Sequence, residues 1–115
     1  MRYTRKEFLT QEPHETGSIV IQLSTPRMKD MRSWNIKEGA YINGSVKISD
    51  CSQNIILDFE SQGDKAHGKR LKKLDKLIEE LQAMRHQYVH MYENAVRDLE
   101  YYKENQQNID KANGN

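Results

Sequence analysis

Long apolar runs are missing from this chain of 115 residues, in which 36% of the side chains are hydrophobic and 30% are charged. A helix that crosses a bilayer needs roughly 18 consecutive apolar residues, and no stretch of the sequence approaches that length. Residues 1–9 carry basic side chains without the apolar segment that follows them in a secretory signal peptide. We therefore expect a protein that makes no membrane contact and stays in the cytoplasm.

Cysteine is almost absent, since Cys51 is the only one in the sequence. A single cysteine excludes an internal disulfide and a cysteine-rich zinc site. No catalytic helper is marked beside it, so we expect Cys51 to be a small buried apolar residue. No carboxylate pair, Ser-His-Asp set or Cys-His pair is indicated by residue spacing either. The sequence therefore predicts neither enzyme activity nor a cofactor.

A strong net charge is lacking too, because 18 basic residues balance 17 acidic ones. This near-neutrality argues against a general nucleic-acid coat protein, which carries an overall basic excess. The charge is uneven along the chain: residues 63–78 hold six basic and two acidic side chains, and residues 79–115 hold four basic and seven acidic ones. A local basic segment is therefore followed by a local acidic one.

Residues 18–62 have the pattern of a small antiparallel sheet. Residues 18–24 are rich in β-branched side chains and end before Pro26, which is typical of a strand. Residues 39–49 and 54–60 alternate apolar and polar side chains, which also predicts strands. The expected fold class is α+β, with a meander of three or four strands followed by one long C-terminal helix.

The segments between these strands are expected to be irregular. Residues 1–17 are polar and close on Pro13 and Gly17, so we interpret them as a flexible N-terminal arm. Residues 27–37 predict a short helical turn or a loop, and residues 50–53 a turn. Asn43-Gly44 is also a hairpin signal, so two interpretations of residues 39–49 stay open: one strand, or a strand that is split into two or carries a bulge.

The helix is predicted over residues 69–104, where neither proline nor glycine interrupts the chain. At 1.5 Å per residue its length is about 54 Å. We expect residues 63–68 to form a basic loop that precedes the helix in one segment, 63–104. Residues 105–115, rich in Asn and Gln, are expected to be a disordered tail.

The helix carries a heptad pattern, with residues spaced alternately by three and four. This spacing is typical of a coiled coil. A sheet of this size covers only part of such a helix, so we expect a second copy to cover the rest in a homodimer or tetramer. The open alternative is a helix folded back on its own sheet. The predicted interface residues are Leu71, Leu74, Ile78, Leu81, Tyr88, Tyr92, Ala95 and Leu99.

The charges along the helix predict antiparallel pairing. The helix begins with basic residues and ends with acidic ones, opposite to the preference of the helix dipole. An antiparallel partner lays the basic start beside the acidic end of its mate. It also places Arg85 beside Tyr88 of the second copy, whereas parallel pairing stacks Arg85 on Arg85.

Residues 63–70 read G-x-x-x-x-G-K-R, which is similar to a phosphate-binding loop. Arg70 stands where that motif has the magnesium-binding hydroxyl, and the chain offers no later strand for an acidic magnesium ligand, so a nucleotide hydrolase is not expected. Two interpretations stay open: a solvated basic linker, or an anion site at the helix start. The candidate ligands of that anion site are Lys65, His67, Lys69 and Arg70, and Lys73 is a further candidate for binding a ligand or partner.

Two further groups on the helix are candidates for ligand binding. His86 and His90 are four residues apart, a spacing that suits a shared metal, but no third ligand is marked and we expect no metal site. Arg85, Tyr88 and Tyr92 are either packing groups of the interface or the lining of an intersubunit pocket for a phosphate-bearing nucleotide.

Three short stretches carry a resemblance: Asp50-Cys51-Ser52, Leu57-Asp58-Phe59 and residues 73–81. Together they resemble short uncharacterised proteins of phages and bacterial mobile elements. The resemblance implies an accessory protein that binds a host factor, with a component of a defence system as the concrete expectation.

The sequence thus predicts a non-enzymatic phage or mobile-element protein that oligomerises through its helix and binds a host macromolecule, a host protein above all. One alternative is a protein that sequesters a phosphate-bearing signal nucleotide between subunits. The other is a small dimer that binds nucleic acid through the basic residues 65–76.

Overall fold

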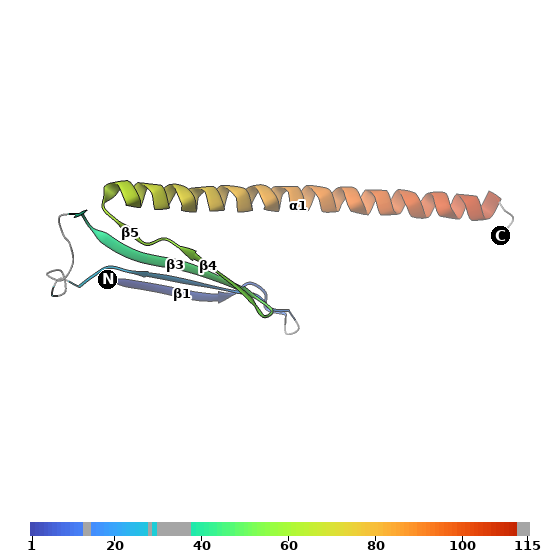
Figure 1. The fold of residues 1–115 in the computed structure, drawn as a ribbon. Coiled ribbons are helices and arrows are strands. Elements are labelled where there is room, and N and C mark those ends of the chain that lie inside the picture. The colour runs from blue at the N-terminus through green and yellow to red at the C-terminus, as the bar shows by residue number, and fades with distance from the viewer. Residues whose placement is uncertain (13–14, 28, 30–37, 113–115) are drawn as a thin grey trace. The chain divides into compact units, whose positions relative to one another are not determined.

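The computed structural model describes residues 1–12, 15–27, 29 and 38–112. It confirms the α+β class, with an antiparallel β meander followed by one long helix (Figure 1). The chain forms two compact units, Met1–Lys73 and Leu74–Asn115. The first unit contains the whole sheet and the first turns of the helix, and the second consists of the rest of the helix.

Four strands form the meander in the order β1-β2-β3-β4, and every neighbouring pair is antiparallel. Their bounds are Arg2–Phe8 for β1, Ser18–Ser24 for β2, Tyr41–Asp50 for β3 and Gln53–Asp58 for β4. A two-residue strand, β5 (Ser61–Gln62), pairs with the start of β3. Three of the strands fall close to the expected ranges 18–24, 39–49 and 54–60.

The register sorts the sheet into an apolar and a polar face. Ile21 pairs with Val46, and Val46 pairs in turn with Leu57. Because side chains alternate along a strand, residues directly opposite one another share a face. The apolar face consists of Ile19, Ile21, Leu23, Val46, Ile48, Ile55 and Leu57. The apolar residues that alternate along β2, β3 and β4 in the sequence therefore lie together on one face of the sheet.

The flexible arm predicted for residues 1–17 is wrong in its first half. Strand β1 occupies Arg2–Phe8 and pairs with all seven residues of β2. Most of its side chains are charged or polar, so no hydrophobic alternation marks it in the sequence. Main-chain hydrogen bonds to β2 hold it instead, and the Leu9 amide donates to the Gly17 carbonyl at 2.8 Å as the chain turns.

Asn43-Gly44 is not a turn, because both residues lie within the continuous strand β3. Gly44 serves close packing: a Cβ there would lie 2.8 Å from Leu23 Cδ2 and 3.3 Å from Phe59 Cβ. The Phe59 amide also donates to the Gly44 carbonyl at 2.8 Å. The short side chain is therefore needed for its neighbours on the sheet. Of the loop or turn predicted for residues 27–37, residues 28 and 30–37 lie outside the described part of the chain.

The predicted turn at residues 50–53 is a tight hairpin in which Asp50 pairs with Gln53. Cys51 stands at its tip with a φ of 53° and is exposed, so the expectation that it is buried is wrong. The Thr16 hydroxyl fixes the tip: it accepts from the Cys51 amide at 2.9 Å and donates to Asp50 Oδ1 at 3.0 Å. Cys51 therefore adopts the backbone conformation of the turn, and its side chain faces solvent.

Helix α1 runs without interruption over Asp64–Ala112, a span of 49 residues that exceeds the predicted 69–104 at both ends. It begins after Gly63, whose carbonyl accepts from the His67 amide at 3.0 Å. The predicted basic loop at residues 63–68 is therefore wrong beyond Gly63. The prediction of a disordered tail is also wrong over residues 105–112, because no proline or glycine stops the helix there.

Burial within one chain is shallow. Among the described residues no hydrophobic side chain is buried, and Ser61, 5% exposed, is the one polar residue that is. The apolar face of the sheet is half-buried at β2 and more open at Ile55, which is 55% exposed. Within the same residues, no helix combines the length and the apolar character that crossing a membrane requires.

Two glycines at the start of α1 make a matched pair for testing this fold. Gly63 has a φ of 85°, and a Cβ there would lie 2.6 Å from the Glu38 carbonyl oxygen; at Gly68 a Cβ would meet nothing within 4 Å. We expect Gly63→Ala to lower the free energy of unfolding by about 2 kcal/mol or more. Gly68→Ala should raise it by about 0.5–1 kcal/mol. Urea denaturation at one protein concentration measures both, and equal effects of the two substitutions would contradict the helix start described here.

Candidate functional site

The basic residues at the start of α1 were predicted to form an anion site, and two of them contact the sheet side of their own unit. Arg70 Nε donates to the Glu60 carbonyl at 3.0 Å, and Lys73 Nζ donates to the Asp58 carbonyl at 2.6 Å. Lys73 Nζ also lies 4.9 Å from the centre of the Phe59 ring, a cation–π contact. These two cations attach the first turns of the helix to the chain that leaves β4.

The other three predicted ligands of that site, Lys65, His67 and Lys69, are exposed on the same turns. The G-x-x-x-x-G-K pattern is not a phosphate-binding loop, because residues 64–69 are helical and cannot wrap their amides around a phosphate. Asp64 in the first turn adds a negative charge where an anion would lie. The structure thus divides the five candidates: Arg70 and Lys73 are used in tertiary contacts, and Lys65, His67 and Lys69 face solvent.

A polar cluster that sequence reasoning missed lies beside Arg70. The Tyr41 hydroxyl donates to Glu60 Oε1 at 2.7 Å, next to the buried Ser61 of β5. These residues and Arg70 belong to the lining of a cavity of about 280 Å³. The hydrogen bond to Glu60, followed by burial and by the negative charges of Glu60 and Asp58, raises the pKa of Tyr41. The contact joins residues far apart in sequence, so no local pattern signals it.

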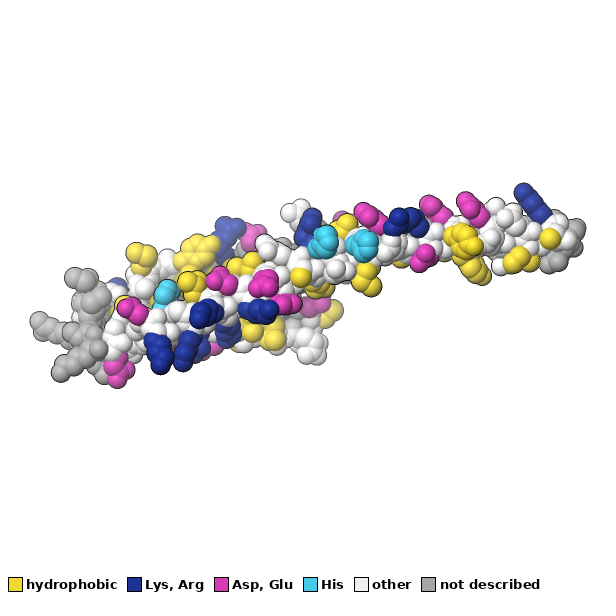
Figure 2. Space-filling view, turned by 90° about the horizontal axis from the view of Figure 1, so that it is seen from above, with side chains coloured by type: hydrophobic (Ala, Val, Ile, Leu, Met, Phe, Trp, Pro, Cys, Tyr) yellow, Lys and Arg dark blue, Asp and Glu magenta, His cyan; other side chains and the backbone are white. Residues whose placement is uncertain are grey.

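The predicted interface residues lie exposed along α1. Figure 2 shows hydrophobic side chains at the surface along the helix, between the charged ones. In the second unit, Leu81 is 53% exposed, Tyr88 72% and Tyr92 68%. Such values are typical of surface residues, yet these side chains are large and apolar. Leu71, Ile78, Ala95 and Leu99 are exposed as well, and Leu74 is half-buried.

Arg85, Tyr88 and Tyr92 follow one another at spacings of three and four, so they share one face of α1. Each is exposed, and one helix alone offers them no enclosing wall. The shallow cavity nearest to them, about 320 Å³, is lined by Tyr92, Glu93, Val96 and Arg97. Neither Arg85 nor Tyr88 lines this cavity, so a nucleotide pocket formed by all three residues requires a second chain.

Outside this stripe, α1 carries polar contacts within single turns. Lys76 Nζ lies 2.9 Å from Glu80 Oε1 and 3.9 Å from Glu79 Oε1, and the hydrogen bond to Glu80 raises the pKa of Lys76. His90 Nε2 lies 3.3 Å from Asn94 Nδ2. In the described part of the chain, no three His, Cys, Asp or Glu side chains gather where a metal could bind. Among those residues, His86 and His90 therefore have no third ligand beside them.

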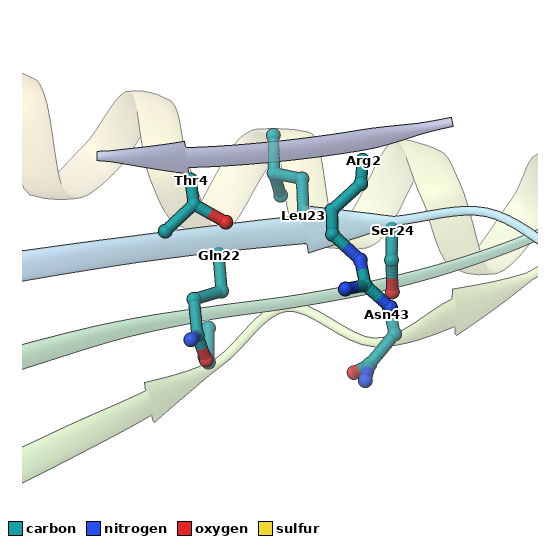
Figure 3. A pocket seen from close by; sticks show the side chains of 7 residues that line it. Arg2, Thr4, Gln22, Leu23, Ser24 and Asn43 are labelled. Carbon is teal, nitrogen blue, oxygen red and sulfur yellow. The ribbon is translucent and has the colours of Figure 1, made fainter.

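The polar face of the sheet carries a depression of about 260 Å³ (Figure 3). Its polar side chains point to one side of the sheet, while Leu23, its single apolar member, points to the other. No carboxylate lines it. The lining consists of Arg2, Thr4, Gln22, Leu23, Ser24, Asn43 and Ser45. Sequence reasoning missed this surface because it assigned residues 1–17 to an arm.

Comparisons with protein-family models, with curated proteins and with solved structures found no match to this chain.

The Tyr41–Glu60 hydrogen bond predicts a late component in an alkaline titration of the six tyrosines. Because the pKa of Tyr41 is raised in the folded state, its hydroxyl stabilises the fold fully below pH 10.0, the ordinary pKa of the group. That stabilisation is lost as the pH rises through the higher folded value. Phenolate absorbance measures the titration, and Tyr41→Phe should remove the late component. If Tyr41→Phe leaves the late component in place, the hydrogen bond to Glu60 is absent in solution.

Proposed function

We propose that this chain is a non-enzymatic binding protein that self-associates through α1 and binds a macromolecule. One observation carries the proposal: among the described residues no hydrophobic side chain is buried, although 36% of the sequence is hydrophobic. Exposed apolar surface of this extent is unfavourable in water, and on soluble proteins it marks an interaction site. A second copy of the same helix supplies a matching surface.

The position of the exposed residues supports pairing between helices. Leu74, Leu81 and Leu99 fall on the two heptad positions that coiled coils use for their apolar contacts. Met84 and Met91, 63% and 64% exposed, widen the stripe on one flank. A stripe wider than two heptad positions suits a bundle as well as a simple pair, which keeps both dimer and tetramer open.

Charge supports an antiparallel arrangement. The first part of α1 carries Lys69, Lys72 and Lys76, and the last part carries Asp98, Glu100 and Glu104. In an antiparallel pair these opposite charges lie beside each other, while a parallel pair brings like charges together. The arrangement also relieves the unfavourable interaction of each charged end with its own helix dipole.

A single register brings all the predicted contacts together. If Arg85 lies against Tyr88 of the second copy, the guanidinium stacks on an aromatic ring and every other layer is apolar. Leu74 then lies against Leu99, and Leu81 against Tyr92. The two remaining layers pair Leu71 with Tyr102 and Ile78 with Ala95. All ten side chains belong to the heptad positions of α1.

The resemblance to short phage and mobile-element proteins favours a host macromolecule as the partner, and a host defence protein in particular. The cytoplasm is the compartment in which such a partner is met. The contacts of Arg70 and Lys73 with the sheet side of their unit weaken the alternatives that need those cations free. Self-association is the part of the proposal that the residues of the chain support most directly.

Light scattering tests self-association. We expect the wild-type chain to have the mass of a dimer or tetramer. Leu81→Asp should dissociate it, because a charge placed in an apolar layer costs several kcal/mol. Ala83→Asp is the matched control: it introduces the same carboxylate two residues further along, outside the stripe, and should leave the mass unchanged. A wild-type monomer, or equal masses for both variants, would refute pairing through this stripe.

Disulfide formation between single-cysteine chains tests the direction. Leu74→Cys and Leu99→Cys are prepared separately with Cys51→Ser, mixed and oxidised. Antiparallel pairing predicts crosslinks between the two variants, because residues 74 and 99 face each other. Parallel pairing predicts crosslinks within each variant. Crosslinks of the second kind would leave self-association intact and overturn the direction.

A further inference from the structure

We propose that the polar face of the sheet binds single-stranded nucleic acid. The proposal does not depend on self-association, and it places nucleic-acid binding on the sheet, away from the basic start of α1. Three observations carry it: the position of three cations, an exposed aromatic ring on the same face, and a depression lined by hydroxyl and amide groups.

The register brings the cations onto one face. Lys6 and Lys47 both pair with Val20, so they flank it in one row across β1, β2 and β3. Arg2 lies on the same face, four residues earlier along β1. Across the part of the chain that the structure describes, none of the three makes an ion pair. Three cations without acidic partners are available to phosphate groups, which dominate the affinity of proteins for nucleic acid.

Acidic side chains are nearly excluded from this face. Asp58 is the one carboxylate among the strand residues that share it, and it belongs to β4, at the edge of the sheet opposite to β1. Glu7 lies on the other face, where it pairs with Arg5 at 2.5 Å. The chain as a whole has a net charge of only +1, yet this face combines three cations with one acid.

Phe8 supplies an aromatic surface on the same face. Phe8 is 74% exposed, and its cross-strand neighbours in that row, Ser18 and Ser49, are small. Small neighbours leave the face of the ring uncovered, and bases of single strands stack on such rings. Val20 and Ile56 are further apolar residues of this face, and Ile56 is 65% exposed, so Phe8 adds an aromatic ring to aliphatic and cationic groups that are open to a ligand. An acidic protein surface would match the cations but would make no use of the ring.

The depression provides groups for sugars and base edges. Thr4, Ser24 and Ser45 contribute hydroxyls, and Gln22 and Asn43 contribute side-chain amides. Figure 3 shows Arg2 reaching from β1 toward Ser24 and Asn43, so that one cation lies among these groups. Donors and acceptors of this kind bind the edges of unpaired bases, which a sheet reaches more easily in a single strand than in a duplex.

The first turns of α1, up to Lys73, contact the apolar face of the sheet and not the polar face. Phe59 Cβ lies 3.3 Å from a Cβ built on Gly44, on the apolar face, and Lys73 lies over the Phe59 ring. The turns of α1 up to Lys73 therefore leave the polar face free.

Fluorescence anisotropy with a labelled oligothymidylate of about 20 nucleotides, at about 50 mM salt, tests the proposal. We expect binding by the wild-type chain. Lys6→Gln combined with Lys47→Gln should weaken it at least tenfold and reduce the slope of log affinity against log salt by about 1.4, the value for two lost phosphate contacts. Phe8→Ala should weaken binding roughly tenfold with an unchanged salt slope, because stacking is lost without a charge.

Two controls keep the chemistry matched. Arg5→Gln removes a cation from the same strand but from the opposite face, and Lys103→Gln removes one from the distant part of α1; each should change the affinity less than twofold. Circular dichroism and light scattering on every variant separate loss of fold or of self-association from loss of binding. No binding by the wild type, or equal binding by the sheet variants, overturns the proposal. Displacement by poly-glutamate together with full binding by Phe8→Ala would also overturn it, in favour of an acidic protein partner.

Discussion

The antiparallel pairing of β2 with both β1 and β3 decides where every side chain of the sheet lies. One register places Ile21 and Val46 together on one face and Val20 between Lys6 and Lys47 on the other. A shift by one residue would exchange the two faces. The packing of Phe59 and Lys73 on one side and the polar depression on the other both follow from this pairing.

The two faces pose different physical problems. The apolar face and the stripe along α1 carry side chains that gain free energy when a partner removes them from water. The polar face is already stable in water, and its cations and exposed ring are the groups that the proposed nucleic-acid ligand would contact. Self-association addresses the first problem, and binding of a charged, base-bearing ligand addresses the second. The two proposals thus place assembly and recognition on different surfaces.

Local sequence patterns were sufficient to predict an element where its composition or hydrophobic periodicity is distinctive. β2 has β-branched residues before Pro26, and α1 has no proline or glycine after Gly68 until residue 114, so both were predicted. β1 was missed because an edge strand held by main-chain bonds needs no apolar alternation. Gly44 was interpreted as a turn because its reason for being glycine, the closeness of Leu23 and Phe59, is a tertiary contact. The Tyr41–Glu60 bond and the polar face depend on register, which no local pattern supplies.

β1 lies at the outside of the sheet, where one row of its amides and carbonyls faces no neighbouring strand. Such a row is a template on which another chain can add a strand, and repeated addition leads to fibrils. Arg2, Arg5, Lys6 and Glu7 put four charges on seven residues of this strand. An incoming strand would have to bring its own side chains against those charges. The charged composition that made β1 hard to recognise in the sequence thus also opposes edge-to-edge growth of the sheet.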